Sequence, residues 1–214
     1  MGWIGMARKP LQARSILSTT RMLDAAELIF AEGGDNALTV EAVVKRAETS
    51  VGNFYGRFGD RDGLLQAMHD RFLERLGVAG QAAVSLSGRE KTLGRAINVF
   101  IKQAFATFHE HRNSARFFIL HRSLDQGMRA QGIQANAMLA GMFTTLVLGY
   151  SNEITHNCPK IAADVAYRLT FAAVMQQVMF DNHEVSGVSI ANRTLVREVT
   201  HCLVTYLKSP TKTA

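Results

Sequence analysis

Proline and cysteine are both scarce in this sequence. Only 3 prolines occur in 214 residues, and they leave two very long proline-free spans. Because proline interrupts helices, these spans favour a helical chain. The 2 cysteines show no spacing typical of a zinc site or a disulfide framework, which indicates a reducing, cytoplasmic compartment. No segment has the strict alternation of apolar and polar residues that predicts strands, so we expect an all-α fold.

Long hydrophobic runs and catalytic motifs are also missing. The most apolar stretch, MLAGMFTTLVLGY at 138–150, is shorter than the ~20 residues that span a bilayer, so we expect a buried helix and no membrane partner. No secretory signal follows the first residues. There is no GxSxG, phosphate loop or HExxH, so we expect no enzymatic activity and no cofactor. His109 and His111 cannot share a helix face, and no metal site is predicted.

The charge of the chain is uneven along its length. The net charge is +6, which suggests an anionic partner, but residues 1–75 hold equal numbers of basic and acidic side chains. The excess therefore lies in residues 76–214, and net charge alone identifies no partner. Residues 1–13 are expected to form a loose basic arm. Its Arg8 and Lys9, together with Arg14, either reach a DNA backbone or make no fixed contact.

The first part of the chain predicts a series of helices separated by turn residues. Apolar residues at helical spacing predict a first helix over about 14–32, which Gly33 and Gly34 end. The N-cap residues Thr39 and Ser50 precede two short helices, and Asp60 precedes a fourth, which is expected to fade in the glycine-rich stretch 77–87. Two short helices that rest on a longer one are typical of a helix-turn-helix unit.

The second short helix, within AETSVGNFYGRF at 47–58, has two different faces. Phe54 and Phe58 are four residues apart, so they share a face that we expect to dock on the first helix. The opposite face carries polar side chains that could enter a DNA major groove. Asparagine can pair with both N6 and N7 of an adenine, and arginine can read guanine or hold a phosphate. The base-reading and phosphate-binding candidates of this helix are Val51, Asn53, Tyr55 and Arg57.

Residues 21–65 resemble the TetR family of bacterial transcription regulators. The resemblance rests on RMLDAAELIF, TVEAVVKRA, GNFYGRF and DRDGLL, which match the pattern of the first four helices as a set. It implies phosphate contacts by Thr39, Tyr55 and Arg61, base contacts by Val51, Gly52 and Asn53, and a dimer. The sequence departs from the family pattern where Glu48 replaces the usual turn glycine, and also at Thr49 and Val51.

The second part predicts five further helices, roughly over 89–110, 114–124, 136–156, 160–183 and 190–208, with loops at 125–134 and 183–189. Apolar faces on the last two helices suit a four-helix dimer interface. The region is rich in methionine and phenylalanine, which suit a pocket for an apolar or aromatic effector but equally a plain core. The candidate pocket residues are Phe100, Phe105, Phe117, Met138, Met142, Phe143, Met175 and Met179.

These patterns predict two domains, a helix-turn-helix DNA-binding domain at 14–60 and a helical effector-binding and dimerisation domain at 61–208. The leading hypothesis is a cytoplasmic, ligand-responsive regulator, expected to be a repressor, that binds a palindromic double-stranded operator as a homodimer. The alternative is a helical small-molecule-binding protein whose degenerate motif no longer binds DNA. Glu48 and the balanced charge of residues 1–75 keep that alternative open.

Overall fold

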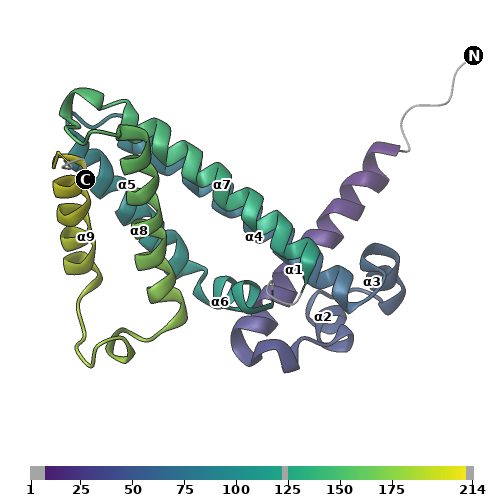
Figure 1. The fold of residues 1–214 in the computed structure, drawn as a ribbon. Coiled ribbons are helices and arrows are strands. Elements are labelled where there is room, and N and C mark those ends of the chain that lie inside the picture. Colours follow the sequence, from purple (N-terminus) through teal and green to yellow (C-terminus); the bar gives the residue numbers. More distant parts are fainter. Residues whose placement is uncertain (1–7, 122–124, 211–214) are drawn as a thin grey trace, which may run out of the picture. The chain divides into compact units, whose positions relative to one another are not determined.

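Helices are the only regular secondary structure in residues 8–121 and 125–210, the part of the chain that the computed structural model describes (Figure 1). For residues 8–15 and 121 only the backbone is described. The prediction of an all-α fold is therefore confirmed. The α-helices are α1 (Arg8–Ala37), α2 (Val40–Arg46), α3 (Val51–Phe58), α4 (Arg61–Ser87), α5 (Leu93–Glu110), α6 (Arg112–His121), α7 (Gln126–Leu148), α8 (Pro159–Met179) and α9 (Asn192–Leu207). Two short 3-10 helices lie at Ser151–Glu153 and Asn182–Glu184.

The chain divides into two compact units, Met1–Phe72 and Leu73–Ala214. The first unit holds α1, α2, α3 and the first part of α4. The second holds the remainder of α4 and helices α5 to α9. This division falls inside α4, whereas the sequence places a domain boundary at its start, so the domain limits stay a prediction.

Side-chain caps begin the short helices of the first unit where the sequence predicts them. The oxygen atoms of Thr39, Ser50 and Asp60 accept hydrogen bonds from backbone amides three residues further on. The donors are the amides of Ala42, Asn53 and Gly63, at 3.2, 3.2 and 2.8 Å. Each cap satisfies an N–H group that has no partner within its helix. The three predicted N-caps are confirmed, and they fix where α2, α3 and α4 start.

A small apolar core holds the first unit together. Gly34 has φ of 68° and kinks α1 near its end, a conformation that glycine adopts without steric cost. Gly63, in the first turn of α4, has no room for a side chain, because a Cβ there would lie 1.9 Å from the Phe58 carbonyl oxygen. The core residues of this unit are Met22, Ala26, Ile29, Phe30, Leu38, Val43, Val44, Phe54, Leu64, Leu65, Met68 and Phe72.

Aromatic rings form the centre of the second unit. Helices α5, α8 and α9 pack side by side, with α7 against α8 (Figure 1). The Phe143 ring lies 4.8 Å from that of Phe100 and 5.9 Å from that of Tyr167, measured between centroids. The Tyr167 hydroxyl donates to Asn136 Oδ1 at 2.7 Å, and burial raises the pKa of Tyr167 to about 12. Tyr167 therefore stays a neutral donor within this core at any physiological pH.

Two predictions about the second unit are wrong, and both depended on glycine. Residues 126–134 were expected to form a loop, but they are the first turns of α7, which Asp125 caps by accepting from the Met128 amide at 2.7 Å. Helix α4 also does not fade after Gly77 but runs to Ser87. A Cβ on Gly80 would lie 2.3 Å from Leu139 Cδ2, so this glycine lets α4 and α7 approach closely.

The predicted basic arm is partly helical. Helix α1 begins at Arg8, six residues before the predicted start, so the backbone from there to residue 13 is not a loose arm. Residues 1–7 lie outside the described part of the chain, and so do the side chains of Arg8, Lys9 and Arg14. Their DNA contacts therefore stay predictions. Residues 211–214 also lie outside the described part.

Candidate nucleic-acid interface

A fully buried phenylalanine docks the short helix α3. Phe54 has no exposed surface, and its ring centroid lies 5.2 Å from that of Phe58. The Gly59 amide ends the helix by donating to the Tyr55 carbonyl at 2.9 Å. Caps at both ends and one buried ring thus hold eight residues in a helix. An isolated helix this short would be marginal in water, so its stability comes from this docking.

The opposite face of α3 is exposed, as the sequence predicts. Val51 is 48% exposed and Tyr55 is 50% exposed, and Gly52, Asn53 and Arg57 are exposed with them. The structure therefore brings together all five candidate residues of this helix. The Tyr55 ring stands at 84° to that of Phe54, with centroids 5.6 Å apart. This edge-to-face contact fixes the ring while the hydroxyl end reaches solvent.

Asn53 makes two side-chain hydrogen bonds that sequence reasoning did not find. Its Nδ2 donates to Ser18 Oγ at 2.7 Å and to Thr49 Oγ1 at 2.8 Å. Ser18 lies on α1, 35 residues earlier in the chain, and no local sequence pattern pairs these two positions. Thr49 lies four residues before Asn53, but it precedes the helix, so the helical spacing rule does not apply.

The other two candidates lie beside the corner between α1 and α2. Thr39 is exposed, with its hydroxyl oxygen engaged as the cap of α2. Arg61 is partly buried, and it donates from Nε to the Leu38 carbonyl at 3.0 Å. Its Nη2 donates to the Asp35 carbonyl at 3.1 Å and also pairs with the Asp35 carboxylate. Arg61 thus ties the start of α4 to this corner, and its phosphate contact stays a prediction.

Helix α2 is held to α1 by an exposed ion pair. Arg46 donates to both carboxylate oxygens of Glu32, at 2.5 and 2.7 Å. The hydrogen bond from Arg46 lowers the pKa of Glu32, and the same bond raises the pKa of Arg46. Both side chains are well exposed, so water and salt screen the pair. It orients the two helices more than it stabilises them.

The turn between α2 and α3 carries backbone strain at Glu48. Glu48 has φ of 50°, the left-handed conformation that favours glycine, and it is the only described non-glycine residue with positive φ. The following amide, that of Thr49, donates to the Val44 carbonyl at 3.0 Å and closes the turn. The turn therefore keeps its geometry despite the missing glycine.

Replacing Glu48 with glycine is expected to stabilise the protein and to strengthen DNA binding. Relief of the left-handed backbone is worth about 1–2 kcal/mol, and the flexibility that glycine adds to the unfolded chain offsets about half of it. We therefore expect Glu48→Gly to raise the free energy of unfolding by about 0.5–1 kcal/mol. Removing the carboxylate also removes repulsion from DNA phosphates. Denaturant unfolding and DNA titration measure the two effects.

Glu48→Ala is the matched control for this prediction, because it removes the charge and keeps a side chain in the strained conformation. It is expected to strengthen DNA binding without the gain in stability. If Glu48→Gly unfolds at the same denaturant concentration as Glu48→Ala, the turn stores no strain.

The candidate pocket residues of the second unit do not all lie together. Phe100, Phe105 and Phe143 are buried in one apolar core, and Met175 packs against it. Phe117, Met142 and Met179 are partly buried, and the Phe117 ring pairs with that of Phe118. Met138 is 49% exposed and contributes little to any enclosed site. The effector pocket therefore stays a prediction.

A surface groove with a volume of about 630 Å³ lies between α5 and α9. None of its residues was predicted to bind a ligand. The lining residues are Glu90, Gly94, Arg95, Asn98, Val99, Arg197, Thr200, His201 and Val204. Asn98 Nδ2 donates to Thr200 Oγ1 across it at 3.1 Å, so part of its polar lining is already paired within the chain.

The described residues show no sign of other kinds of site. None of their helices combines the length and the apolar character needed to cross a membrane. They also bring together no group of three or more His, Cys, Asp or Glu side chains suited to a metal ion. Both cysteines are exposed and unpaired.

Comparison with known proteins assigns part of the first unit to a family. The described chain combines an all-helical fold with an N-terminal helix-turn-helix unit. The family profile of the bacterial regulatory proteins of the tetR family matches residues 22–68, which include α2 and α3. The resemblance of the first helices to the TetR family is therefore confirmed over residues 22–68, and the chain has the TetR-like fold. Comparison with curated protein sequences found no significant match.

Solved structures share the fold over most of the chain. A protein from Mesorhizobium loti, described as a TetR-family transcriptional regulator, superposes with a TM-score of 0.73 at 14% identity, covering 91% of this chain and 96% of that one. The regulator FadR from Bacillus subtilis, in complex with stearoyl-CoA, gives 0.65 at 16% identity, covering 87% and 98%. The fatty acid degradation regulator FadR from Bacillus halodurans gives 0.64 at 16% identity, covering 87% and 94%.

Proposed function

We propose that this protein is a ligand-responsive transcriptional repressor that binds a palindromic operator as a homodimer in the bacterial cytoplasm. The observation that carries the proposal is the two-sided helix α3. One of its rings is completely buried, while its polar side chains are exposed on the opposite face. That arrangement suits insertion into a major groove, where side chains at the start of a recognition helix meet base edges.

A dimer is proposed because one helix-turn-helix covers only a half-site. Two copies would place their recognition helices ~34–36 Å apart or a multiple of that distance. Helices α8 and α9 supply a surface for such a contact, since Leu169 and Phe180 are about half exposed. Leu203, on the apolar side of α9, is 1% exposed and belongs to the core of its own chain. The α9 part of the interface would therefore rest on its partly exposed residues, such as Leu195 and Val199.

The second unit is proposed to bind an apolar effector. An apolar chain would enter between the rings of Phe100, Phe143 and Tyr167. The flexible Met175 side chain packs against this core and would move to make room for it. The FadR structure of the same fold holds stearoyl-CoA, a ligand with a long apolar chain. A ligand changes DNA affinity only by binding one conformation better, and such couplings amount to ~1–3 kcal/mol.

Selection of bound fragments from genomic DNA, followed by footprinting with and without acyl-CoA esters, tests the proposal directly. Tyr55→Phe is then expected to weaken binding about tenfold on every DNA sequence, because it removes one hydrogen bond to a charged phosphate. The hydroxyl carries no charge, so the slope of affinity against salt concentration should not change. Fluorescence anisotropy over a salt series measures both.

Tyr206→Phe is the control, since it removes the same hydroxyl from α9 and should leave DNA affinity unchanged. Equal losses of DNA affinity in the two variants would show that Tyr55 does not contact DNA. A wild-type chain that protects no DNA fragment would favour the alternative, a helical binding protein with a degenerate motif. The specific observation behind that alternative is Glu48, an acidic residue in the turn that leads into α3.

A further inference from the structure

The Nδ2 amino group of Asn53 has both of its N–H donors in hydrogen bonds within the first unit. An asparagine side chain has two N–H donors on Nδ2 and one oxygen acceptor. The distances of 2.7 Å to Ser18 Oγ and 2.8 Å to Thr49 Oγ1 are those of good hydrogen bonds, so both donors are in use. Among the described residues, none donates a hydrogen bond to Asn53 Oδ1. The exposed side chain therefore offers an acceptor and no donor.

The two hydroxyl partners come from separate elements that are themselves fixed. Ser18 lies on α1, and Thr49 lies in the turn whose backbone is bonded to the Val44 carbonyl at 3.0 Å. Asn53 precedes the fully buried Phe54 and lies in the first turn of a capped helix, so its backbone is also held. Two hydrogen bonds thus hold the carboxamide group of Asn53 in one orientation. Turning it to present its N–H groups would break both hydrogen bonds.

We propose that Ser18 and Thr49 make Asn53 an acceptor-only reader of the operator, with the two hydroxyls as positioning residues. In the major groove Asn53 Oδ1 would accept from an exocyclic amino group, N4 of cytosine or N6 of adenine. The bidentate pairing of asparagine with adenine also needs an N–H aimed at N7. That N–H is held by Ser18 or Thr49. This inference depends on the proposed function, because it concerns how a DNA-bound α3 reads its site.

The proposal fixes the base preference at one operator position. Guanine and thymine offer only acceptor atoms in the major groove, which repel an acceptor oxygen. Cytosine and adenine both offer an amino group, so the wild-type protein should bind them within about threefold of one another. Guanine and thymine should bind about tenfold more weakly, in line with the loss of one base contact.

Removing either hydroxyl is expected to change this preference. Ser18→Ala and Thr49→Val each release one N–H of Asn53, which can then pair with adenine N7. Adenine should gain about fivefold or more over cytosine in each variant. The measurement is the affinity of the full-length protein for four operator duplexes that differ in the base at one position. That position is the one where Asn53→Ala abolishes discrimination between bases. Ser18→Thr keeps the hydroxyl and should keep the wild-type ratio.

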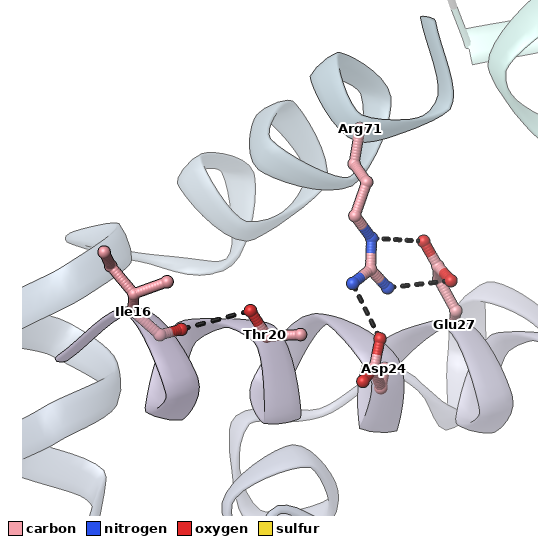
Figure 2. Close-up of polar contacts among 5 residues, drawn as sticks. All are labelled: Ile16, Thr20, Asp24, Glu27 and Arg71. Carbon is pink, nitrogen blue, oxygen red and sulfur yellow. Dashed lines mark hydrogen bonds and ion pairs between the residues drawn. The ribbon is translucent and has the colours of Figure 1, made fainter. Parts of the chain in front are cut away.

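Thr20→Val is the matched control, since Thr20 lies two residues from Ser18 on the same helix. Its hydroxyl donates to the Ile16 carbonyl at 3.1 Å (Figure 2). Thr20 is not among the partners of the Asn53 Nδ2 atom. Thr20→Val should leave the ratio of adenine to cytosine unchanged. Suppose that the protein binds its operator with the same ratio of adenine to cytosine affinity in wild type, Ser18→Ala and Thr49→Val. That result would overturn this inference and leave the proposed function intact. A wild-type protein that already prefers adenine tenfold would do the same. A protein that protects no DNA would overturn the proposed function as well.

Discussion

Phe54→Ala is expected to unfold helix α3 locally and to abolish operator binding. Phe54 is completely buried, and truncation of a buried phenylalanine to alanine costs about 3–5 kcal/mol. The cost falls on a helix of 8 residues that has no other fully buried side chain. Since a loss of 1.4 kcal/mol changes an equilibrium tenfold, the exchange protection of the α3 amides should fall at least a hundredfold. Hydrogen exchange of the full-length protein measures this fall.

Leu28→Ala is the matched control for this substitution. Leu28 is an apolar residue of the same unit but is 51% exposed, so its truncation should change stability by less than about 0.5 kcal/mol. Phe54→Leu retains part of the buried volume and should lie between the two. Protection of α3 in Phe54→Ala equal to that in Leu28→Ala would show that the helix is held by its caps and not by its buried ring.

The first unit was predictable from sequence because its signals are local. Each short helix starts at a capping residue that bonds an amide three positions on, and Thr39, Ser50 and Asp60 do this. The buried residues of α4 in this unit, from Leu64 to Phe72, also follow helical spacing. Such patterns depend on neighbours within four residues, and packing in the folded chain did not shift the helix starts that they predict.

Glycine misled the prediction in the second unit because its role there depends on another helix. The stretch 77–87 was expected to end a helix, yet its Gly80 allows Leu139 to approach from α7. Gly132 was read as part of a loop, yet it is buried within α7. From sequence alone, a glycine that weakens a helix cannot be distinguished from one that permits close packing, since the partner lies far along the chain.

In the candidate interface, the sequence located the exposed residues but not what holds them. Asn53 and Tyr55 were placed correctly on the outer face of α3 from their spacing to Phe54. The link from Ser18 to Asn53 joins positions 35 residues apart, and no pattern within one helix indicates it. Likewise Arg61 was assigned to a phosphate by resemblance, whereas its contacts at the corner near Asp35 follow only from the way the chain turns.

Replacing Arg71 is expected to lower the stability of the protein, with an effect second only to that of Phe54→Ala. The reason is that Arg71 joins α4 to α1 through two carboxylates. Its Nη1 donates to Asp24 at 2.7 Å, while Nε and Nη2 each face one oxygen of Glu27 at 2.8 Å (Figure 2). The Arg71 and Glu27 side chains are only 15% and 21% exposed. Exposed ion pairs contribute about 0–1 kcal/mol, but removing one partner of a buried pair costs about 3–5 kcal/mol. Arg71→Met should therefore lower the free energy of unfolding by about 2–3 kcal/mol, an intermediate value.

The loss should depend on geometry as well as charge. Arg71→Lys keeps a cation but cannot face both oxygens of Glu27 at once, so it should recover only part of the stability. Arg46→Met breaks a bidentate pair of similar distances at an exposed site and should cost much less. Combining Arg71→Met with Glu27→Gln should cost less than the sum of the single changes, because the buried carboxylate that lost its partner is then uncharged. Denaturant unfolding of the five variants, Glu27→Gln alone included, provides the test. Equal losses in Arg71→Met and Arg46→Met would mean that burial adds nothing to the Arg71 contact.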